Sequence, residues 1–308
     1  MGAPIDFTNH IDISDRSWTS GGLTFYGYND LTDEFISEVA GNPVVRFVQI
    51  TKSLPEQAFA AIDRILALRE DMFFRLYSLD GNTRFDMSCL HRLKHLRHLV
   101  VDAHLRDNHD ALDLKVLTEL EGLRSLRLRL FDLRDYGFVR ELSPNLEELL
   151  IYADTMGGAV TFDCDWLERY EKLERLFLGK KAKKHLESIA DISSLRSLTL
   201  RGIKPNSFDF LRHTGLQSLS LGWCGMNDLS SLAGFGLKSL ELWRINKLED
   251  ISFISTLLQL ETLRLQDLKH IRTLPDMSAL KHLRDITLDN VPVDTEALPE
   301  YLRGIVHR

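Results

Sequence analysis

The sequence predicts an α/β solenoid in which a parallel β-sheet forms one side, short helical segments form the other, and a cap closes each end. The first observation is a six-residue motif, L-x-x-L-x-L, that occurs nine times with some substitutions. The second is its spacing, because successive copies begin 21 to 27 residues apart. The third is the alternation within each copy, which is typical of a short strand with one apolar face. The nine copies begin at Leu96, Leu123, Leu146, Leu173, Leu195, Leu216, Leu237, Leu260 and Leu283.

One copy of the motif cannot bury its own apolar face, so neighbouring copies must stack to make a continuous core. The nine in-frame copies across residues 93–291 resemble the leucine-rich-repeat family, whose units are 20 to 29 residues long. The resemblance implies a horseshoe with a concave parallel sheet and short 3₁₀ or α segments on the convex side. The short units from Leu195 onward look like those of bacterial internalins and phosphatase regulators. Such a resemblance predicts the architecture but hardly the activity.

Residues 1–92 match the motif poorly, and we expect an N-terminal cap made of degenerate repeats. Residues 45–50 and 74–79 read as strands, and residues 54–69 between them show apolar positions at helical spacing. A further strand is expected over residues 23–26, after Gly21 and Gly22. The alternative is a separate small domain with its own function.

The repeat region covers residues 93–291. Its shorter units leave room for only a turn or two of helix on the outer side. The longer units are expected to carry longer outer helices or projecting loops over residues 106–117 and 154–170. Residues 292–308 are expected to form a C-terminal cap helix, with Asp294 as its N-cap and an end near Leu302.

Composition narrows the class of protein. The net charge of −7 argues against a general nucleic-acid binder, which needs a basic surface. No apolar run approaches the 18 residues of a membrane span, and residues 1–6 show no secretory signal, so we expect a cytoplasmic location. The three cysteines are odd in number and widely spaced, which favours reduced thiols.

The sheet face is the predicted binding surface. In each strand the leucines point inward, and three rows of residues point outward: those before, between and after the two strand leucines, here called rows one, two and three. Arginine and aromatic side chains, which are enriched at protein interfaces, collect in these rows, whereas lysine is absent. The predicted partner-binding residues are Arg127, Arg129, Leu150, Tyr152, Arg175, Phe177, Arg201, Trp223, Trp243 and Arg264.

Two alternatives remain for this surface. The aromatic side chains could pack against one another along the sheet without binding a partner. Trp223 and Arg244 lie just past the strand ends, beside Trp243, and either extend the binding surface towards one edge or fill the turn.

Three stretches suggest chemistry. His91 and His95 would share a helix face, as metal ligands can, but no H-E-x-x-H glutamate or cysteine pair accompanies them. Cys164 lies between two aspartates, which raise a thiol pKa, and no histidine is close in sequence to act as a base. The basic run from Lys180 to Lys184 reads either as a phosphate-contacting or targeting patch or as an exposed, distorted loop. We therefore predict no catalytic residue, metal site or cofactor.

The sequence thus predicts a non-catalytic, monomeric module that binds a partner protein, without nucleic acid or membrane. One specific hypothesis is an intracellular inhibitor or immunity protein that occludes a toxin or enzyme, since an acidic chain would steer a basic partner. The alternatives are a regulatory or scaffold subunit, or a metal-dependent or enzymatic site in the N-terminal region.

Overall fold

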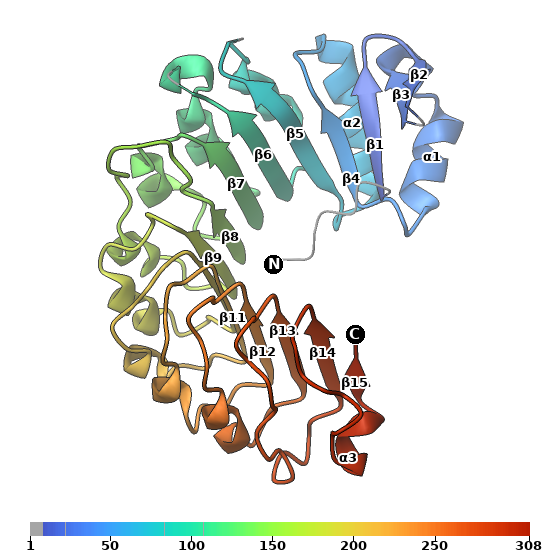
Figure 1. Ribbon diagram of the computed structural model, residues 1–308. Coiled ribbons are helices and arrows are strands. Elements are labelled where there is room, and N and C mark those ends of the chain that lie inside the picture. The colour runs from blue at the N-terminus through green and yellow to red at the C-terminus, as the bar shows by residue number, and fades with distance from the viewer. Residues whose placement is uncertain (1–8, 22, 83, 107) are drawn as a thin grey trace. The chain divides into compact units, whose positions relative to one another are not determined.

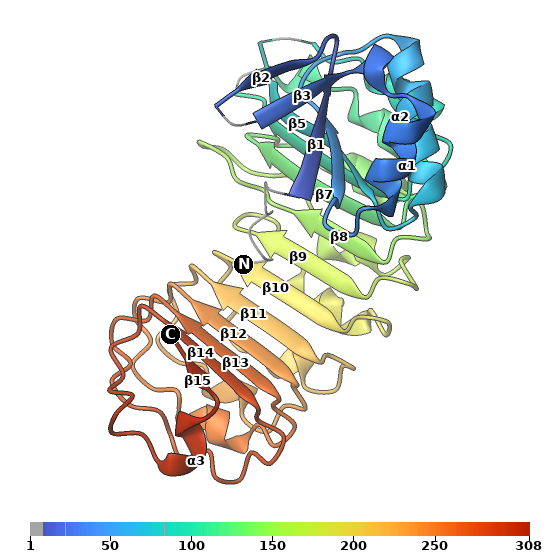
Figure 2. The same ribbon diagram turned by 90° about the vertical axis from the view of Figure 1, so that its right-hand side faces the viewer.

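The computed structural model describes residues 9–21, 23–82, 84–106 and 108–308. The predictions that concern residues 1–6 and Gly22 lie outside the described residues. The chain forms two compact units that divide between residues 162 and 163. We call them the N-terminal unit and the C-terminal unit and describe each by itself (Figures 1 and 2).

In the N-terminal unit, the strands follow one another in the sheet in the order β8-β7-β6-β5-β4-β1-β3-β2. Neighbouring strands are parallel, except that β2 and β3 form an antiparallel pair. The strands are β1 (His10–Ser14), β2 (Trp18–Ser20), β3 (Leu23–Gly27), β4 (Phe47–Ile50), β5 (Phe73–Asp80), β6 (His98–His104), β7 (Ser125–Phe131) and β8 (Glu148–Ile151). The strands expected near residues 23–26, 45–50 and 74–79 are therefore present as β3, β4 and β5.

Helices cover one face of this sheet. The helix expected over residues 54–69 is α2 (Glu56–Leu68), and it buries Phe59, Ile62 and Ile65 against the sheet. Its neighbour α1 (Asp33–Gly41) was not predicted, although Thr32 caps it by accepting a hydrogen bond from the N–H of Phe35 at 3.2 Å. The 3₁₀ helices are η2 (Tyr28–Asp30), η3 (Met87–Arg92), η4 (His109–Ala111), η5 (Leu114–Glu119) and η6 (Gly137–Glu141).

The C-terminal unit is a stack of parallel strands that run side by side from β9 to β15 (Figure 2). The strands are β9 (Arg175–Gly179), β10 (Ser197–Arg201), β11 (Ser218–Gly222), β12 (Ser239–Trp243), β13 (Thr262–Gln266), β14 (Asp285–Asp289) and β15 (Val306–His307). On the other side lie η7 (Cys164–Leu167), η8 (Leu186–Asp191), η9 (Asp209–Leu211), η10 (Ser230–Leu232) and η11 (Ser252–Thr256). Of the longer outer segments expected over residues 106–117 and 154–170, the described residues form loops with 3₁₀ helices and not long α-helices.

The core is made by the leucines of the motif. The two inward residues of every strand from β9 to β14 are at most 3% exposed, and they pair in register from strand to strand. Each such side chain contributes about 1.5 to 3 kcal/mol when it is buried. The predicted inward and outward faces of the repeats are confirmed.

A single residue after each of these strands adopts a left-handed backbone. After β9 to β13, the N–H of this residue continues the ladder to the last residue of the next strand; for example, Trp223 donates to the carbonyl of Trp243 at 3.1 Å, and Arg244 donates to that of Gln266 at 3.0 Å. This conformation costs about 1 to 2 kcal/mol for an L-residue, which the hydrogen bond helps to offset. We call these residues the edge row: Lys180, Gly202, Trp223, Arg244, Asp267 and Asn290.

The C-terminal cap differs from the prediction. Asp294 accepts a hydrogen bond from the N–H of Glu296 at 3.0 Å in a local turn, and the helix α3 spans only Glu300–Arg303. The reason is Pro299, because the residue before a proline is disfavoured in the α conformation. A helix therefore cannot run from Asp294 through Leu298.

None of the helices in the described residues is long and apolar enough to cross a membrane. The longest, α2, has 13 residues. The division into residues 1–92, 93–291 and 292–308 stays a prediction, although β5 and β6 pair directly across the first of its boundaries.

Candidate functional site

The C-terminal unit presents rows one, two and three as straight lines across its sheet. Strand pairing places Phe177 beside Thr199, and Glu241 beside Arg264, all in row two. Phe177 is half-buried, whereas Arg175 in row one is exposed. Arg264 is also exposed, and its Nε lies 3.7 Å from Oε1 of Glu241. The face therefore displays cationic and aromatic groups that the core does not use.

Trp223 is held in place at the end of this face. Its indole is 48% exposed, and its ring lies edge-on to that of Trp243, with centroids 6.2 Å apart. The guanidinium carbons of Arg201 and Arg244 lie 5.3 Å and 5.0 Å from the centre of the Trp223 ring. Such cation–π contacts contribute about 0.5 to 1 kcal/mol each at exposed sites. Trp223 and Arg244 are thus an exposed cluster and not filling within a turn.

The expectation that Trp243 is an exposed surface residue is wrong, because its side chain is only 2% exposed. The ring lies over Gly222 in the preceding strand, where any Cβ atom would overlap it. Its Nε1 donates a hydrogen bond to Oγ of Ser220 at 3.3 Å, and Ser220 donates to Glu241 at 2.6 Å. Trp243 is therefore a packed part of the sheet face.

In the N-terminal unit, Leu150 on β8 and Tyr152 just after it are half-buried. Arg127 on β7 makes two hydrogen bonds to Glu148, at 2.6 Å and 3.2 Å, and its guanidinium carbon lies 4.3 Å from the centre of the Phe73 ring. The internal ion pair fixes the guanidinium group of Arg127. Leu150 and Tyr152, in contrast, are predicted binding residues with uncharged side chains.

A buried polar network, which the repeat motif does not reveal, runs along the same face. Arg75 on β5 is 1% exposed and donates to Oδ2 of Asp102 at 2.8 Å, with its guanidinium carbon 4.0 Å from the centre of the Tyr77 ring. Burial lowers the pKa of Arg129, and the charge of Asp102 opposes that shift. Extending row two back from Val100 would have found Arg75, because the two residues pair in register.

Two other sequence features meet in the C-terminal unit. Nδ1 of His185 lies 2.9 Å from a carboxylate oxygen of Asp163 and 2.9 Å from one of Asp165, while Nζ of Lys184 lies 2.6 Å from Asp163. A histidine does therefore approach these acids in the fold, although none is close to them in sequence. The three carboxylate and imidazole groups could ligate a divalent ion, but the Lys184 ammonium already neutralises Asp163.

The thiol beside this cluster is not activated. Cys164 is buried, and burial together with the charges of Asp163 and Asp165 raises its pKa to about 12. The histidines of the other stretch are engaged separately, since His91 lies 2.9 Å from Glu119 and His95 lies 3.0 Å from Asp63. Neither arrangement provides a nucleophile with a base.

The Asp163 cluster predicts a specific acid sensitivity. Burial raises the pKa of Asp163, but hydrogen bonds from Lys184, the N–H of Asp165 and His185 outweigh burial and leave it below its ordinary value of 3.8. The folded state thus binds fewer protons than the unfolded state near that pH, so the stabilisation is present above pH 3.8 and is lost on acidification. In urea unfolding, Asp163→Asn should reduce stability at about pH 5 and much less at about pH 3. An equal effect at both pH values would contradict this assignment.

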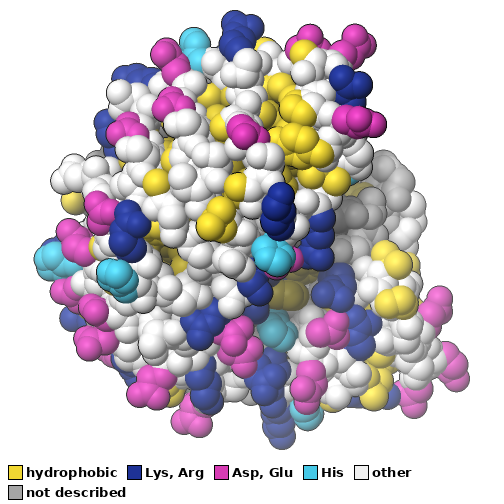
Figure 3. All heavy atoms as spheres, turned by 90° about the horizontal axis from the view of Figure 1, so that it is seen from below, with side chains coloured by type: hydrophobic (Ala, Val, Ile, Leu, Met, Phe, Trp, Pro, Cys, Tyr) yellow, Lys and Arg dark blue, Asp and Glu magenta, His cyan; other side chains and the backbone are white. Residues whose placement is uncertain are grey.

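On the face shown in Figure 3, charged groups of both signs are interspersed, with hydrophobic side chains between them. The charge balance nevertheless differs along the chain. Residues 1–162 contain 17 Lys and Arg against 25 Asp and Glu, a net of −8, whereas residues 163–308 contain 21 against 20, a net of +1. The acidity of the protein thus belongs to its N-terminal half.

The repeated motif, the parallel strands and the short outer 3₁₀ helices define the leucine-rich-repeat fold. No protein-family model and no curated protein sequence matches the chain. Among solved structures, an internalin (inlF) of Listeria monocytogenes is 18% identical with a TM-score of 0.48, covering 84% of this chain and 76% of that one. Internalin C2 of the same species is 23% identical with a TM-score of 0.46, covering 63% and 89%. A chain of the Drosophila Toll–Spatzle complex is 16% identical with a TM-score of 0.44, covering 80% of this chain and 36% of that one.

Proposed function

We propose that this protein is a non-catalytic module that binds a partner protein through its sheet faces. The observation that carries the proposal is the display of arginine and apolar side chains, among them Tyr152, Phe177 and Arg175, at registered positions outside the leucine core. A preformed sheet limits the ordering cost of association, which suits recognition of a folded partner.

We further propose that the partner is a basic toxin or enzyme and that the protein acts in the cytoplasm as its inhibitor or immunity protein. The support is the net charge of −8 over residues 1–162, which would attract a basic surface. The association rate should then fall as salt is added, because screening weakens steering.

The test is affinity capture from a cell lysate followed by mass spectrometry. The variant Tyr152→Glu/Phe177→Glu places one negative charge on the sheet face of each unit. A glutamate fits in row two, the row of Phe177, because β12 already carries Glu241 there. We expect the wild type to capture a partner and the variant to lose it, while the melting temperature changes by only a few degrees.

The matched control is Leu68→Glu/Leu258→Glu, which adds the same charge to each unit at side chains that are 60% and 55% exposed outside the sheet rows. The control should capture the partner as the wild type does. Equal capture by wild type and Tyr152→Glu/Phe177→Glu would overturn the sheet-face assignment. Capture of a resident cellular enzyme in place of a toxin would favour the regulatory-subunit alternative.

A further inference from the structure

The strand ends of the C-terminal unit form a groove that adjoins the sheet rows at Asp289, a row-three residue. Two adjoining hollows, of about 520 and 510 Å³, share Lys269 and Asn290. One hollow lies along the edge row from Asn290 to Trp223, and the other runs from Asn290 towards the C-terminal cap. The cationic residues of their lining are Arg244, Lys247, Lys269, Arg272 and Arg308.

The groove is basic although the whole chain is acidic. Its lining includes five Lys and Arg residues but only two aspartates, and one of these, Asp267, is already occupied. Nε of Arg244 lies 2.8 Å from Asp267, and Nδ2 of Asn290 donates to the same carboxylate at 2.7 Å. These two bonds lower the pKa of Asp267, so it stays ionised and paired.

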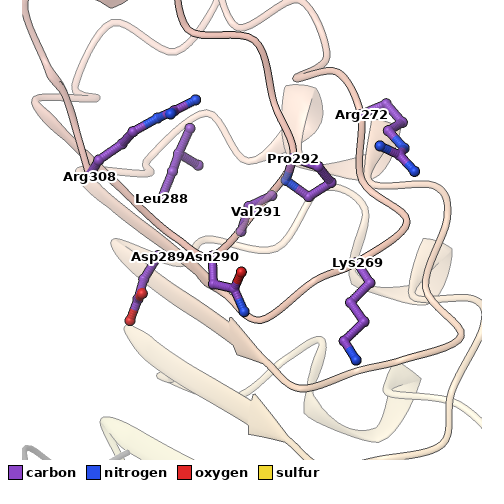
Figure 4. A pocket seen from close by; sticks show the side chains of 8 residues that line it. All are labelled: Lys269, Arg272, Leu288, Asp289, Asn290, Val291, Pro292 and Arg308. Carbon is purple, nitrogen blue, oxygen red and sulfur yellow. The ribbon is translucent and has the colours of Figure 1, made fainter.

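The remaining cations are available to a ligand. Within the part of the chain that the structure describes, Lys247 and Arg272 form no ion pair, and both are exposed. Figure 4 shows Lys269 and Arg272 on the loop after β13, with Arg308 on the far side of Val291 and Pro292. Arg308 is oriented by its hydrogen bond to the carbonyl of Val293 at 2.8 Å.

At its other end the groove is lined by Trp223. The left-handed backbone of Trp223, at φ 56°, and the two guanidinium groups beside its ring hold the indole at the groove wall. The wall offers an apolar surface next to the cations.

We propose that this groove binds an acidic polypeptide segment, whose carboxylates meet Lys247, Lys269 and Arg272 and whose apolar side chain packs on Trp223. The carboxylate of Asp289 and the apolar side chains of Val291 and Pro292 also line the groove. A continuous polyphosphate favours a uniformly basic track, whereas peptide N–H groups can donate to Asp289. The lining therefore fits a peptide better than a nucleic acid.

The test uses the purified full-length protein and three fluorescein-labelled probes at low salt. The probes are a short peptide of alternating glutamate and phenylalanine, the same peptide with glutamine in place of glutamate, and a single-stranded oligouridylate of similar length. Fluorescence polarisation should show that the acidic peptide binds most tightly. The variant Lys247→Glu/Lys269→Glu should weaken that binding by about tenfold or more, and Arg272→Gln should weaken it less.

The matched control is Lys238→Glu/Lys281→Glu, which makes the same charge change at exposed lysines just before β12 and β14, at the opposite end of the strands. It should weaken binding by less than about threefold. Trp223→Asn keeps a residue that tolerates the left-handed backbone, and it should weaken binding and reduce the change in tryptophan emission on peptide addition.

Three results would overturn the proposal: equal affinity for the glutamate and glutamine peptides, equal losses in the groove and control variants, or tighter binding of the oligouridylate. The proposal does not rest on the sheet-face function. Tyr152→Glu/Phe177→Glu should bind the acidic peptide as the wild type does, so failure of one proposal is distinguishable from failure of the other.

Discussion

Trp243→Ala is expected to destabilise the protein by about 3 to 5 kcal/mol, in the range of a buried tryptophan truncated to alanine. The indole is 2% exposed, covers Gly222 and donates a hydrogen bond to Ser220, so its loss leaves a cavity and removes that hydrogen bond. The measurement is urea-induced unfolding followed by circular dichroism.

Trp223 provides the comparison, because it is the same residue type one strand earlier. Trp223→Asn removes the contacts of a half-exposed indole, which lowers stability. Asparagine also adopts the left-handed backbone at a lower cost, which raises stability, so the two effects offset. We expect the unfolding free energy to change by less than about 1 kcal/mol. A loss at Trp223 as large as that at Trp243 would show that both rings belong to the core.

The leucine core could be predicted from the sequence because strand geometry determines it. Side chains alternate between the two faces of a strand, so Leu198 and Leu200 must face one way and Thr199 the other. The same alternation predicted the outward direction of the three rows. The alternation could not predict how exposed each outward side chain is, because that exposure depends on the side chains of the neighbouring strand. Trp243 is covered only because the adjacent residue in row three is Gly222.

Other features depended on contacts between distant residues. His185 follows Asp163 by 22 positions, and the isolated bridge between Asp163 and Lys184 is what brings the imidazole to the carboxylates. The helix α1 lies in a segment without the repeat motif, so the repeat frame gave no reason to expect it. The basic groove was also hidden, because its cations come from the loops after β12 and β13 and from Arg308.

The buried network of the N-terminal unit gives the second large prediction. Asp102 accepts a hydrogen bond from Arg75, and its charge also acts on Arg129, so one carboxylate serves two largely buried guanidinium groups. Asp102→Asn keeps the shape of the side chain but removes the charge, which leaves two like charges together. Removing one partner of a buried pair costs about 3 to 5 kcal/mol, and we expect a loss of that size in urea unfolding.

The double variant separates charge from shape. Asp102→Asn/Arg75→Met also removes one of the two cations, so it should recover part of the stability that Asp102→Asn loses. Glu148→Gln is the control, because it breaks the ion pair with Arg127, whose side chain is 26% exposed, and a smaller loss of about 1 kcal/mol is expected. If the double variant were less stable than Asp102→Asn alone, packing of the Arg75 side chain on Tyr77 would outweigh its charge. That outcome would make Arg75 a packing residue of the sheet face and not a member of an electrostatic network.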